Sequence, residues 1–372
     1  MEELLVCAHQ SKIVQPVTSS HSLCEEAPDG YHEVGPLDIQ VLPGDRLRSH
    51  HVDAWRGLQE CNPELNNPLF APEYVQAVAA VRRDVEVAVI GDKGTSVAFF
   101  PFQRKSQHRG VPVGGIVSDY HGLICRAGFR CDPGALLQGC ELVGWDFDRL
   151  VPSQRGLASY CRLSEPSAQI DLSDGFDAYA RERQRAGTYQ LRYCEYMARR
   201  LERELGPLQF LPHCDEAAAL AQVLSWKSEQ YRGSGWDDLF AHNWARGLVQ
   251  RIHGIQTARF AGMLSVLYAG PFLIAGHMGM RSDTVWHYWF PAYDRRFSRY
   301  SPGMILLWKM AQAAPDLGLR SIDLGTGLSL YKRRLMNASV EVVEGSAETR
   351  SCLNFMRIGR RFLRGLGHSG TR

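Results

Sequence analysis

Apolar residues recur along this chain with two different periods, and the changes between them mark the predicted elements. Neither period is sustained in residues 1–35, where Ser, His, Gln, Pro and acidic residues are mixed, so this segment is predicted to be a flexible lead-in. Alternation at 38–42 predicts a strand, and the stretch 51–58 has the spacing of a helix. Another helix is predicted to begin at Pro72, because proline favours the first helical turn.

The rest of the first half is predicted to contain a hairpin and one more helix. Strand patterns at 85–90 and 96–103 are separated by Gly-Asp-Lys-Gly, a sequence typical of a chain reversal. A Gly-rich passage at 110–122 follows. A short helix is then predicted from Pro133, and an apolar stretch after it closes this half.

The second half opens near Ile170 with an arginine-rich helical region, 176–205, in which Gly187 is a candidate interruption. Asp215 is expected to cap a later helix, because an Asp side chain accepts hydrogen bonds from first-turn amides. The further predicted elements are a strand at 208–211, helices at 215–231 and 244–253, strands at 256–268, 272–280 and 284–290, a helix at 302–314, a strand at 321–324, a helix at 328–336 and a strand at 340–344.

These elements predict an α/β (α+β) chain with two halves, 36–168 and 169–348, each a mixed and mostly antiparallel sheet flanked by helices. A length of 372 residues exceeds what one hydrophobic core usually supports. The helix–strand unit at 133–146 resembles the one at 302–323. This similarity indicates a weak internal duplication, although chance similarity explains it almost as well.

Composition excludes several classes of protein. A hydrophobic content of 45% and a charged content of 22% are typical of a folded soluble protein, and a formal net charge of +2 gives no reason to expect a nucleic acid as partner. The ten cysteines are scattered without a C-x-x-C pair, which favours reduced thiols. Neither a membrane-spanning stretch nor a secretory signal is present, so a cytoplasmic location is predicted.

The segment 299–307 carries the first candidate chemistry. Ser301 can cap the following helix, Pro302 sets its first turn, and Gly303 lets another molecule approach the backbone. The exposed amides of such a helix start form a site for a pyrophosphate. The arginines that could add bonds to phosphate are Arg295, Arg296 and Arg299. The alternative is an ordinary capped helix with a solvated arginine loop.

The second candidate is Asp323, which ends a predicted buried strand and precedes Leu-Gly-Thr-Gly. A buried carboxylate is costly unless it is hydrogen-bonded or serves a function. The alternatives, weighted about equally with a functional role, are a cap for the helix beginning at Leu328 or an anchor for the glycine turn. Tyr331 and Lys332 follow shortly afterwards.

These motifs together resemble a known family. Tyr-Ser-Pro-Gly at 300–303, Asp-Leu-Gly-x-Gly at 323–327, Tyr331-Lys332 and the earlier Ser-Asp-Tyr at 118–120 occur in the same order in the FemAB-related branch of the GCN5-type (GNAT) acetyltransferases, in particular the cellulose-biosynthesis (CelD/BcsL-like) group. The resemblance covers roughly 40–348. It implies two tandem GNAT-like domains, of which the second binds acyl-CoA.

The resemblance also implies a cofactor and roles for individual residues. Acetyl-CoA or another acyl-CoA would lie between the strands 284–290 and 321–324, with its pyrophosphate on the amides of 301–304. The residues expected to bind it are Arg299, Tyr300, Ser301, Pro302, Gly303, Met304 and Lys332. No metal is expected. The usual Arg/Gln-x-x-Gly-x-Gly/Ala signature is absent before the helix, so this assignment depends on the Ser-Pro-Gly turn.

In such enzymes an amine attacks the thioester, so one group must accept a proton and another must supply one to the thiolate. Tyr331 is the expected acid, Asp323 the base or orienting group, and His287 a further catalytic candidate. The residues expected to face the acceptor are Asp119, Tyr120, His277 and Tyr288. The alternative for each strand histidine is a packed, hydrogen-bonded side chain.

The predicted function is therefore acyl-CoA-dependent N-acylation of an amine on a sugar or amino-acid-derived acceptor, with exopolysaccharide or cellulose biosynthesis as the pathway that the resemblance suggests. The alternatives are a FemAB-like aminoacyltransferase and a non-catalytic accessory module of a polysaccharide synthase. Residues 349–372 have apolar positions along one helical stripe with arginines around it, so peripheral membrane contact and packing on the protein itself are both open. Nucleophile-elbow, phosphate-loop and zinc-protease motifs are absent from the sequence.

Overall fold

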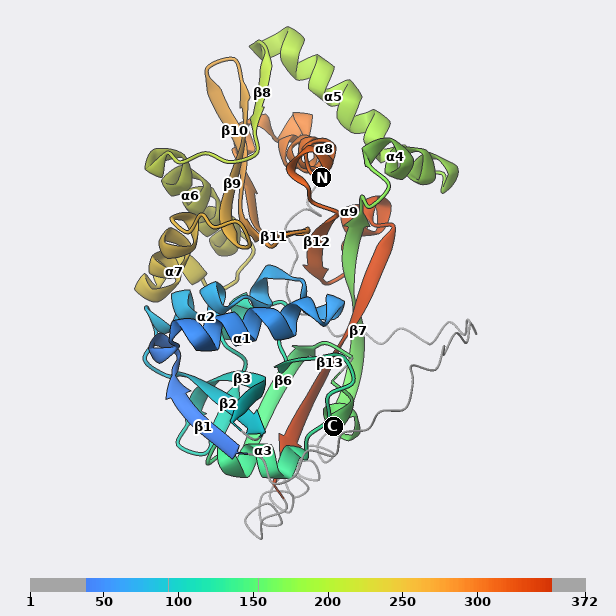
Figure 1. The fold of residues 1–372 in the computed structure, drawn as a ribbon. Coiled ribbons are helices and arrows are strands. Elements are labelled where there is room, and N and C mark those ends of the chain that lie inside the picture. Colours follow the sequence, from blue (N-terminus) through green and yellow to red (C-terminus); the bar gives the residue numbers. More distant parts are fainter. Residues whose placement is uncertain (1–37, 93, 153, 350–372) are drawn as a thin grey trace, which may run out of the picture.

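The computed structural model describes residues 38–92, 94–152 and 154–349. The strands of these residues are β1 (Asp38–Pro43), β2 (Val85–Asp92), β3 (Thr95–Ser106), β4 (Arg109–Val111), β5 (Ile124–Cys125), β6 (Gly144–Leu150), β7 (Cys161–Asp171), β8 (Leu208–Leu211), β9 (Ala261–Ala269), β10 (Phe272–Arg281), β11 (Val285–Tyr293), β12 (Ser321–Thr326) and β13 (Ala338–Glu348). They form one 13-stranded sheet in the order β1-β2-β3-β4-β6-β13-β7-β12-β11-β10-β9-β8, and β5 pairs with β3 (Figure 1).

Helices cover both faces of this sheet. They are α1 (Ser49–Glu60), α2 (Pro72–Ala79), α3 (Pro133–Gly139), α4 (Phe176–Arg185), α5 (Gln190–Leu205), α6 (Ala217–Gly233), α7 (Asn243–His253), α8 (Pro302–Ala313) and α9 (Leu330–Leu335). The predicted fold class, a mixed and mostly antiparallel sheet flanked by helices, is confirmed.

One hydrophobic cluster joins the two halves. It includes Trp55 of α1, Tyr74 of α2, Val223 of α6, Leu248 of α7 and Phe290 of β11. In Figure 1, α7 lies beside α2, in agreement with their contacts. Burying one large apolar side chain stabilises a fold by about 2 kcal/mol, so this shared cluster holds the halves together. Separate clusters pack α5 and α8 on the second half and α3 on the first.

The two long strands β7 and β13 join the halves through backbone pairing. β13, the last described strand, lies between β6 and β7, and it pairs antiparallel with both. β7 in turn pairs with β12. The boundary drawn from the sequence at 168/169 falls inside β7, so the sheet continues from one half into the other. The sequence analysis did not predict β7, because its first part is exposed and contains Pro166.

Most predicted elements are confirmed, with shifted ends. The hairpin of β2 and β3 forms, and the helical region divides at Gly187, whose φ of 77° suits glycine. The strand predicted from 256 begins only at Ala261. The capping role predicted for Asp215 is wrong: α6 begins at Ala217 after Glu216, without a side-chain cap, and the Asp215 carboxylate instead contacts His213.

Two predictions concern the ends of the chain and the membrane. The lead-in at 1–35 and all but the first residue of the tail at 349–372 lie outside the described residues. Among the helices that are described, none combines the length and apolar character required to cross a bilayer.

Candidate active site

The site lies where two parallel strands part. β11 pairs with β12 only from Val285–His287 to Ser321–Asp323, after which β11 runs on to Tyr293 and β12 to Thr326. Beyond Asp323 the pairing of β12 with β7 shifts its register, and Gly325 takes a φ of 73°. His287 and Asp323 are therefore neighbours at the last paired position, at the base of the gap between the strands.

Asp323 is buried, and its carboxylate accepts three N–H donors. The Gly325 amide donates to Oδ1 at 2.8 Å, and the side-chain amides of Gln169 and Asn67 donate to Oδ2 at 3.1 and 3.2 Å. The anchoring role for the glycine turn, one of the alternatives from the sequence, is thus present. Because these donors occupy most of the carboxylate lone pairs, the geometry favours an orienting group over a base.

His287 is completely buried between two carboxylates. Its Nε2 lies 3.3 Å from Oδ2 of Asp119, and its Nδ1 lies 3.7 Å from Oδ1 of Asp323. Burial alone would lower the pKa of His287, but the carboxylates outweigh it and raise the pKa to about 9. The imidazole is therefore a cation at neutral pH.

Asp119 and Tyr120 bring the first half into the site. Burial would raise the pKa of Asp119, but His287, followed by Arg149, lowers it to about 2. Its side chain is 25% exposed, whereas Asp323 and His287 are 0% exposed, so Asp119 is the solvent-facing member of the group. Burial and then Asp323 raise the pKa of Tyr120 far above 10, which keeps the phenol protonated.

His277 and Tyr288 lie next to this group but point differently. Nε2 of His277 accepts the backbone N–H of Trp289 at 3.1 Å, and its ring stacks on Tyr288 with centroids 4.6 Å apart. Burial, followed by the charge on His287, lowers the pKa of His277 to about 3. These contacts favour the packed alternative for His277. Tyr288 is buried in the cluster that contains α8, on the opposite face of β11 from His287.

The helix start expected to hold a pyrophosphate is only partly as predicted. Ser301 does not cap α8: its φ and ψ of 55° and 51° are left-handed, and its Oγ lies 3.1 Å from Oη of Tyr193 on α5. The Met304 amide donates to the Ser301 carbonyl, and Pro302 has no N–H. The Gly303 amide has no acceptor within the described part of the chain, and Gly303 and Ser301 are partly exposed.

Tyr300 and Arg299, which were also predicted to bind the cofactor, make contacts within the protein. The Tyr300 hydroxyl donates to Glu204 of α5, and the Arg299 guanidinium lies over the Tyr300 ring at 4.6 Å. Arg299 is nevertheless 65% exposed, so it remains accessible to an anion. Tyr300 is buried and acts as a support for the turn.

Lys332 requires a correction. It was expected to contact the cofactor, but its ammonium group is buried and donates to the carbonyls of Gly325 and Thr326, at 3.1 and 2.6 Å. It fixes the glycine turn that carries Asp323. Tyr331, the expected acid, is half-buried on α9 among partly buried apolar residues.

The chain is similar in sequence to one known protein family and in fold to several solved structures. Residues 189–333 match the family model Acetyltransferase (GNAT) domain. No curated protein matches the sequence. The matched segment contains His287, Asp323 and the Ser-Pro-Gly turn, whereas Asp119 and Tyr120 lie outside it.

Three solved structures resemble the chain over most of its length. The crystal structure of FemX has a TM-score of 0.56 at 9% identity, covering 86% of this chain and 99% of that one. A conserved protein of unknown function from Bacteroides thetaiotaomicron has 0.54 at 11%, covering 84% and 100%. The C-terminal domain of a putative lysylphosphatidylglycerol synthetase from Agrobacterium fabrum has 0.50 at 12%, covering 82% and 95%. At such identities the likeness shows a shared fold.

Several polar residues around the candidate site were not predicted from the sequence. Asn67 and Gln169 bind Asp323, and Arg149 lies 3.7 Å from Asp119 while donating to Thr326. Asn67 precedes Pro68, a pattern that indicates a turn and gives no hint of a distant partner. Gln169 lies on the unpredicted strand β7, so no local signal would have found it.

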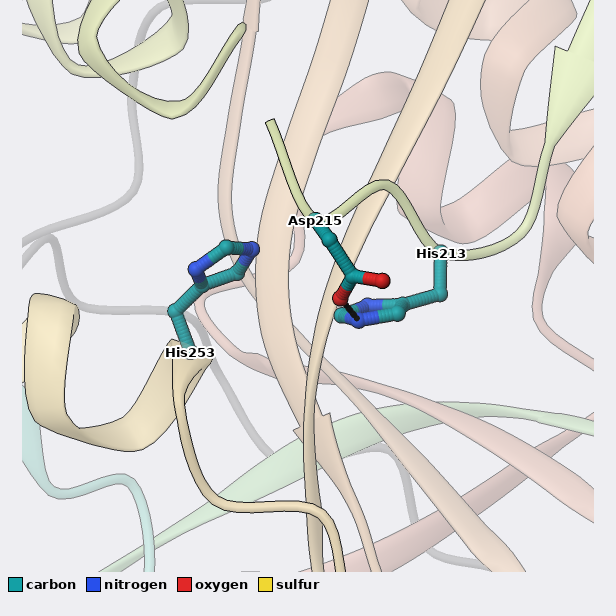
Figure 2. A group of neighbouring side chains, drawn as sticks. All are labelled: His213, Asp215 and His253. Atoms are coloured by element: carbon teal, nitrogen blue, oxygen red, sulfur yellow. Dashed lines mark hydrogen bonds and ion pairs between the residues drawn. The ribbon is translucent and has the colours of Figure 1, made fainter. Parts of the chain in front are cut away.

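A second group of ionisable side chains lies on the α6–α7 side of the GNAT segment. Figure 2 shows His213, Asp215 and His253 around one surface loop. Nδ1 of His213 accepts the Leu264 amide at 3.2 Å, so the Nε2 proton is directed at Asp215, 2.7 Å away; Nε2 of His253 lies 2.9 Å from the Cys214 carbonyl. Both ring nitrogens of His213 are therefore engaged, Nδ1 as an acceptor and Nε2 as a donor, so in this arrangement His213 has no free lone pair for a metal. The absence of a metal cofactor stays a prediction.

Proposed function

We propose that this protein is an acyl-CoA-dependent N-acyltransferase, with its reaction centre where β11 and β12 separate. The observation that supports this most is the position of His287 and Asp323 at the last paired residues of these strands, with Asp119 of the first half opposite. The match to the acetyltransferase domain model over 189–333 and the shared fold support the same class of enzyme.

The proposed donor site uses the gap between the strands and the start of α8. The thioester would enter the gap toward His287, and the pyrophosphate would approach the free Gly303 amide. Arg299 could contribute its exposed charge there. A Cβ added to Gly303 would meet only a ring carbon of Tyr293, at 3.5 Å, so the backbone at this position is open to a ligand.

The proposed chemistry moves one proton from nitrogen to sulfur. The acceptor amine forms a bond to the acyl carbon, the carbon–sulfur bond breaks, and the thiolate takes a proton from cationic His287. Neutral His287 then takes the proton that the new amide nitrogen must lose, which restores the starting state. The two carboxylates keep the imidazole charged between turnovers. Tyr331, half-buried on α9, is the second candidate for the acid.

The acceptor, the acyl group and the pathway are part of the proposal. We expect an acetyl group and an amine of a sugar or amino-acid-derived acceptor, with a hydroxyl as the less favoured nucleophile, in a cytoplasmic step of exopolysaccharide or cellulose biosynthesis. FemX-type and lysylphosphatidylglycerol synthetase folds share this architecture, so transfer of an aminoacyl group is the alternative. A catalytically silent accessory module is the other.

The test combines binding and turnover. Acetyl-CoA should raise the melting temperature, because a ligand that binds only the folded state stabilises it by mass action, by about 2.7 kcal/mol at 100 times its Kd. Acetyl-pantetheine, which lacks the pyrophosphate, should raise it less. Release of free thiol from acetyl-CoA in the presence of a panel of amino sugars and amino acids reports turnover.

His287→Gln should abolish thiol release, and His253→Gln, at the end of α7 (Figure 2), is the matched control that should leave it intact. Binding without turnover by any amine or hydroxyl would favour the silent module. Consumption of an aminoacyl-tRNA without any effect of CoA thioesters would favour the alternative donor.

A further inference from the structure

The carboxylate that faces His287 is held by side chains that lie far from it in the sequence, one in the first half of the chain and one at the boundary between the halves. Asp323 lies on β12, yet two of its three hydrogen bonds come from Asn67 and Gln169, which precede it by 256 and 154 residues. The donating group is a side-chain NH₂ in both cases. At that end, an amide can only donate, so both contacts fit a carboxylate acceptor.

Both donors are placed by the local structure around them. Oδ1 of Asn67 accepts the Leu69 amide at 3.0 Å as the cap of the short helix η4 (Pro68–Phe70), and the residue is 6% exposed. Gln169 is the cross-strand partner of Asp323 in the β7–β12 pairing, and its main-chain carbonyl accepts the Asn337 amide at 3.1 Å, so the sheet fixes the backbone that carries this side chain. The Asn67 amide is therefore oriented by its cap, and the Gln169 amide starts from a backbone position directly opposite Asp323.

We propose that Asn67 and Gln169 are positioning residues that hold the Asp323 carboxylate toward His287, so that the first half of the chain is an integral part of the reaction centre. Their catalytic meaning rests on the proposed acyltransferase function. Their effect on the charge of His287 does not, because it depends only on the geometry of the described residues.

The charge of His287 is set by groups from several elements. Burial opposes the cation, whereas Asp119 from the loop after β4 and Asp323 from β12 favour it; the pKa of neighbouring His277 on β10 is lowered to about 3, so that ring is neutral where His287 titrates. Arg149 and Lys332 act on Asp119. If Asp323 turns away once its donors are removed, one of the two attractive charges is lost. The titration of His287 should then move to lower pH.

The experiment measures the titration of the His287 ring by NMR, with His287→Gln to assign its signal. Asn67→Ser keeps a side chain that can cap η4 but removes the NH₂ donor, and Gln169→Met keeps the length but removes the donor. Asn62→Ser is the matched control: Asn62 caps the neighbouring η3 (Pro63–Leu65) in the same way and donates to the Cys125 carbonyl, at 3.2 Å, instead of Asp323.

In the wild type and in Asn62→Ser, His287 should titrate near pH 9. In Asn67→Ser and Gln169→Met the midpoint should fall by about one pH unit, since a charge 4 to 6 Å away typically shifts a pKa by 1 to 3. Gln169→Glu, which adds a carboxylate of the same shape, should move it upward. Unchanged midpoints in both donor-less variants would overturn the proposal, and either position alone suffices if the other variant does not fold.

Activity gives the second readout. With a productive acceptor, both variants should lower kcat about tenfold, leave KM for acyl-CoA unchanged, and move the alkaline limb of the pH profile to lower pH. A loss of stability without a moved limb would show a merely structural role and contradict the proposal. If the wild type transfers no acyl group, the proposed function fails, while the NMR titration still decides the positioning role.

Discussion

The charge on His287 makes a quantitative prediction about stability. A histidine in an unfolded chain titrates near 6.5, and in the folded protein His287 titrates near 9. Since its folded pKa is raised, its stabilising contribution is complete below pH 6.5 and is lost as the pH rises through about 9. Each pH unit between the two values corresponds to about 1.4 kcal/mol, so the contribution is about 3 kcal/mol.

The perturbation that tests this is His287→Gln, which keeps a polar side chain of similar size and removes the charge. Urea unfolding at pH 6, 7, 8, 9 and 10 gives the free energy of unfolding for both proteins. The difference between wild type and variant should be about 3 kcal/mol larger at pH 6 than at pH 10. If the variant does not fold, Asp119→Asn tests the same pair, because it removes the closer carboxylate.

Other groups that titrate in this range contribute equally to the free energy of unfolding of both proteins, so their contributions cancel in the difference. Burial raises the pKa of the thiols of Cys125 and Cys140 to about 12, so these thiols stay protonated in the fold and destabilise it above pH 9 in wild type and variant alike. A difference between the proteins that is constant from pH 6 to pH 10 would refute the cationic state of His287, and with it the proposed acid.

Three further outcomes concern activity, the helix start and the interlocked strands. Acyl transfer should decline as the pH rises through about 9, because His287 then loses its proton, and Asp119→Asn should move that decline to lower pH in a pH–rate profile. Gly303→Ala should raise KM for acyl-CoA severalfold at unchanged kcat, since the added methyl lies beside the free amide. Its control is Gly57→Ala in α1, where a Cβ meets nothing within 4 Å; this change should add about 0.5–1 kcal/mol to the free energy of unfolding and leave KM unaltered. A chain ending at residue 337 should lack the cooperative unfolding transition in circular dichroism, whereas one ending at 349 should keep it, because only the first loses β13.

The parts of the fold that the sequence predicted are those specified by local patterns. The β2–β3 hairpin follows from alternating apolar residues around a glycine turn, and α8 follows from Pro302 and the apolar run after it. β7 was not predicted because its first part carries exposed polar residues, and its pairing partners on β12 and β13 lie 150 or more residues further along the chain. Local pattern carries no information about such partners.

The site shows the same division. Asp323 stood out because a carboxylate at the end of an apolar strand requires a physical reason, and the Ser-Pro-Gly turn stood out because of its backbone requirements. Lys332 was expected to bind the cofactor because a lysine beside a glycine turn is typical of a phosphate site. The fold instead buries its ammonium group against two backbone carbonyls, which the sequence could not indicate. No local sequence pattern pointed to Asn67 or Gln169, because their role is a hydrogen bond to Asp323, a residue that only the folded sheet brings near them.

The interlocking of the halves and the construction of the site have one physical cause. β13 lies between β6 and β7, and β7 carries Gln169 directly opposite Asp323, so the same pairings that close the sheet also bring a donor to the buried carboxylate. A buried ion group such as Asp119, His287 and Asp323 is stable only while every member keeps its partners. Because those partners come from both halves, separating the halves would expose or unpair the charges. The second half alone, although it holds the whole segment that matches the acetyltransferase model, should therefore not form this centre.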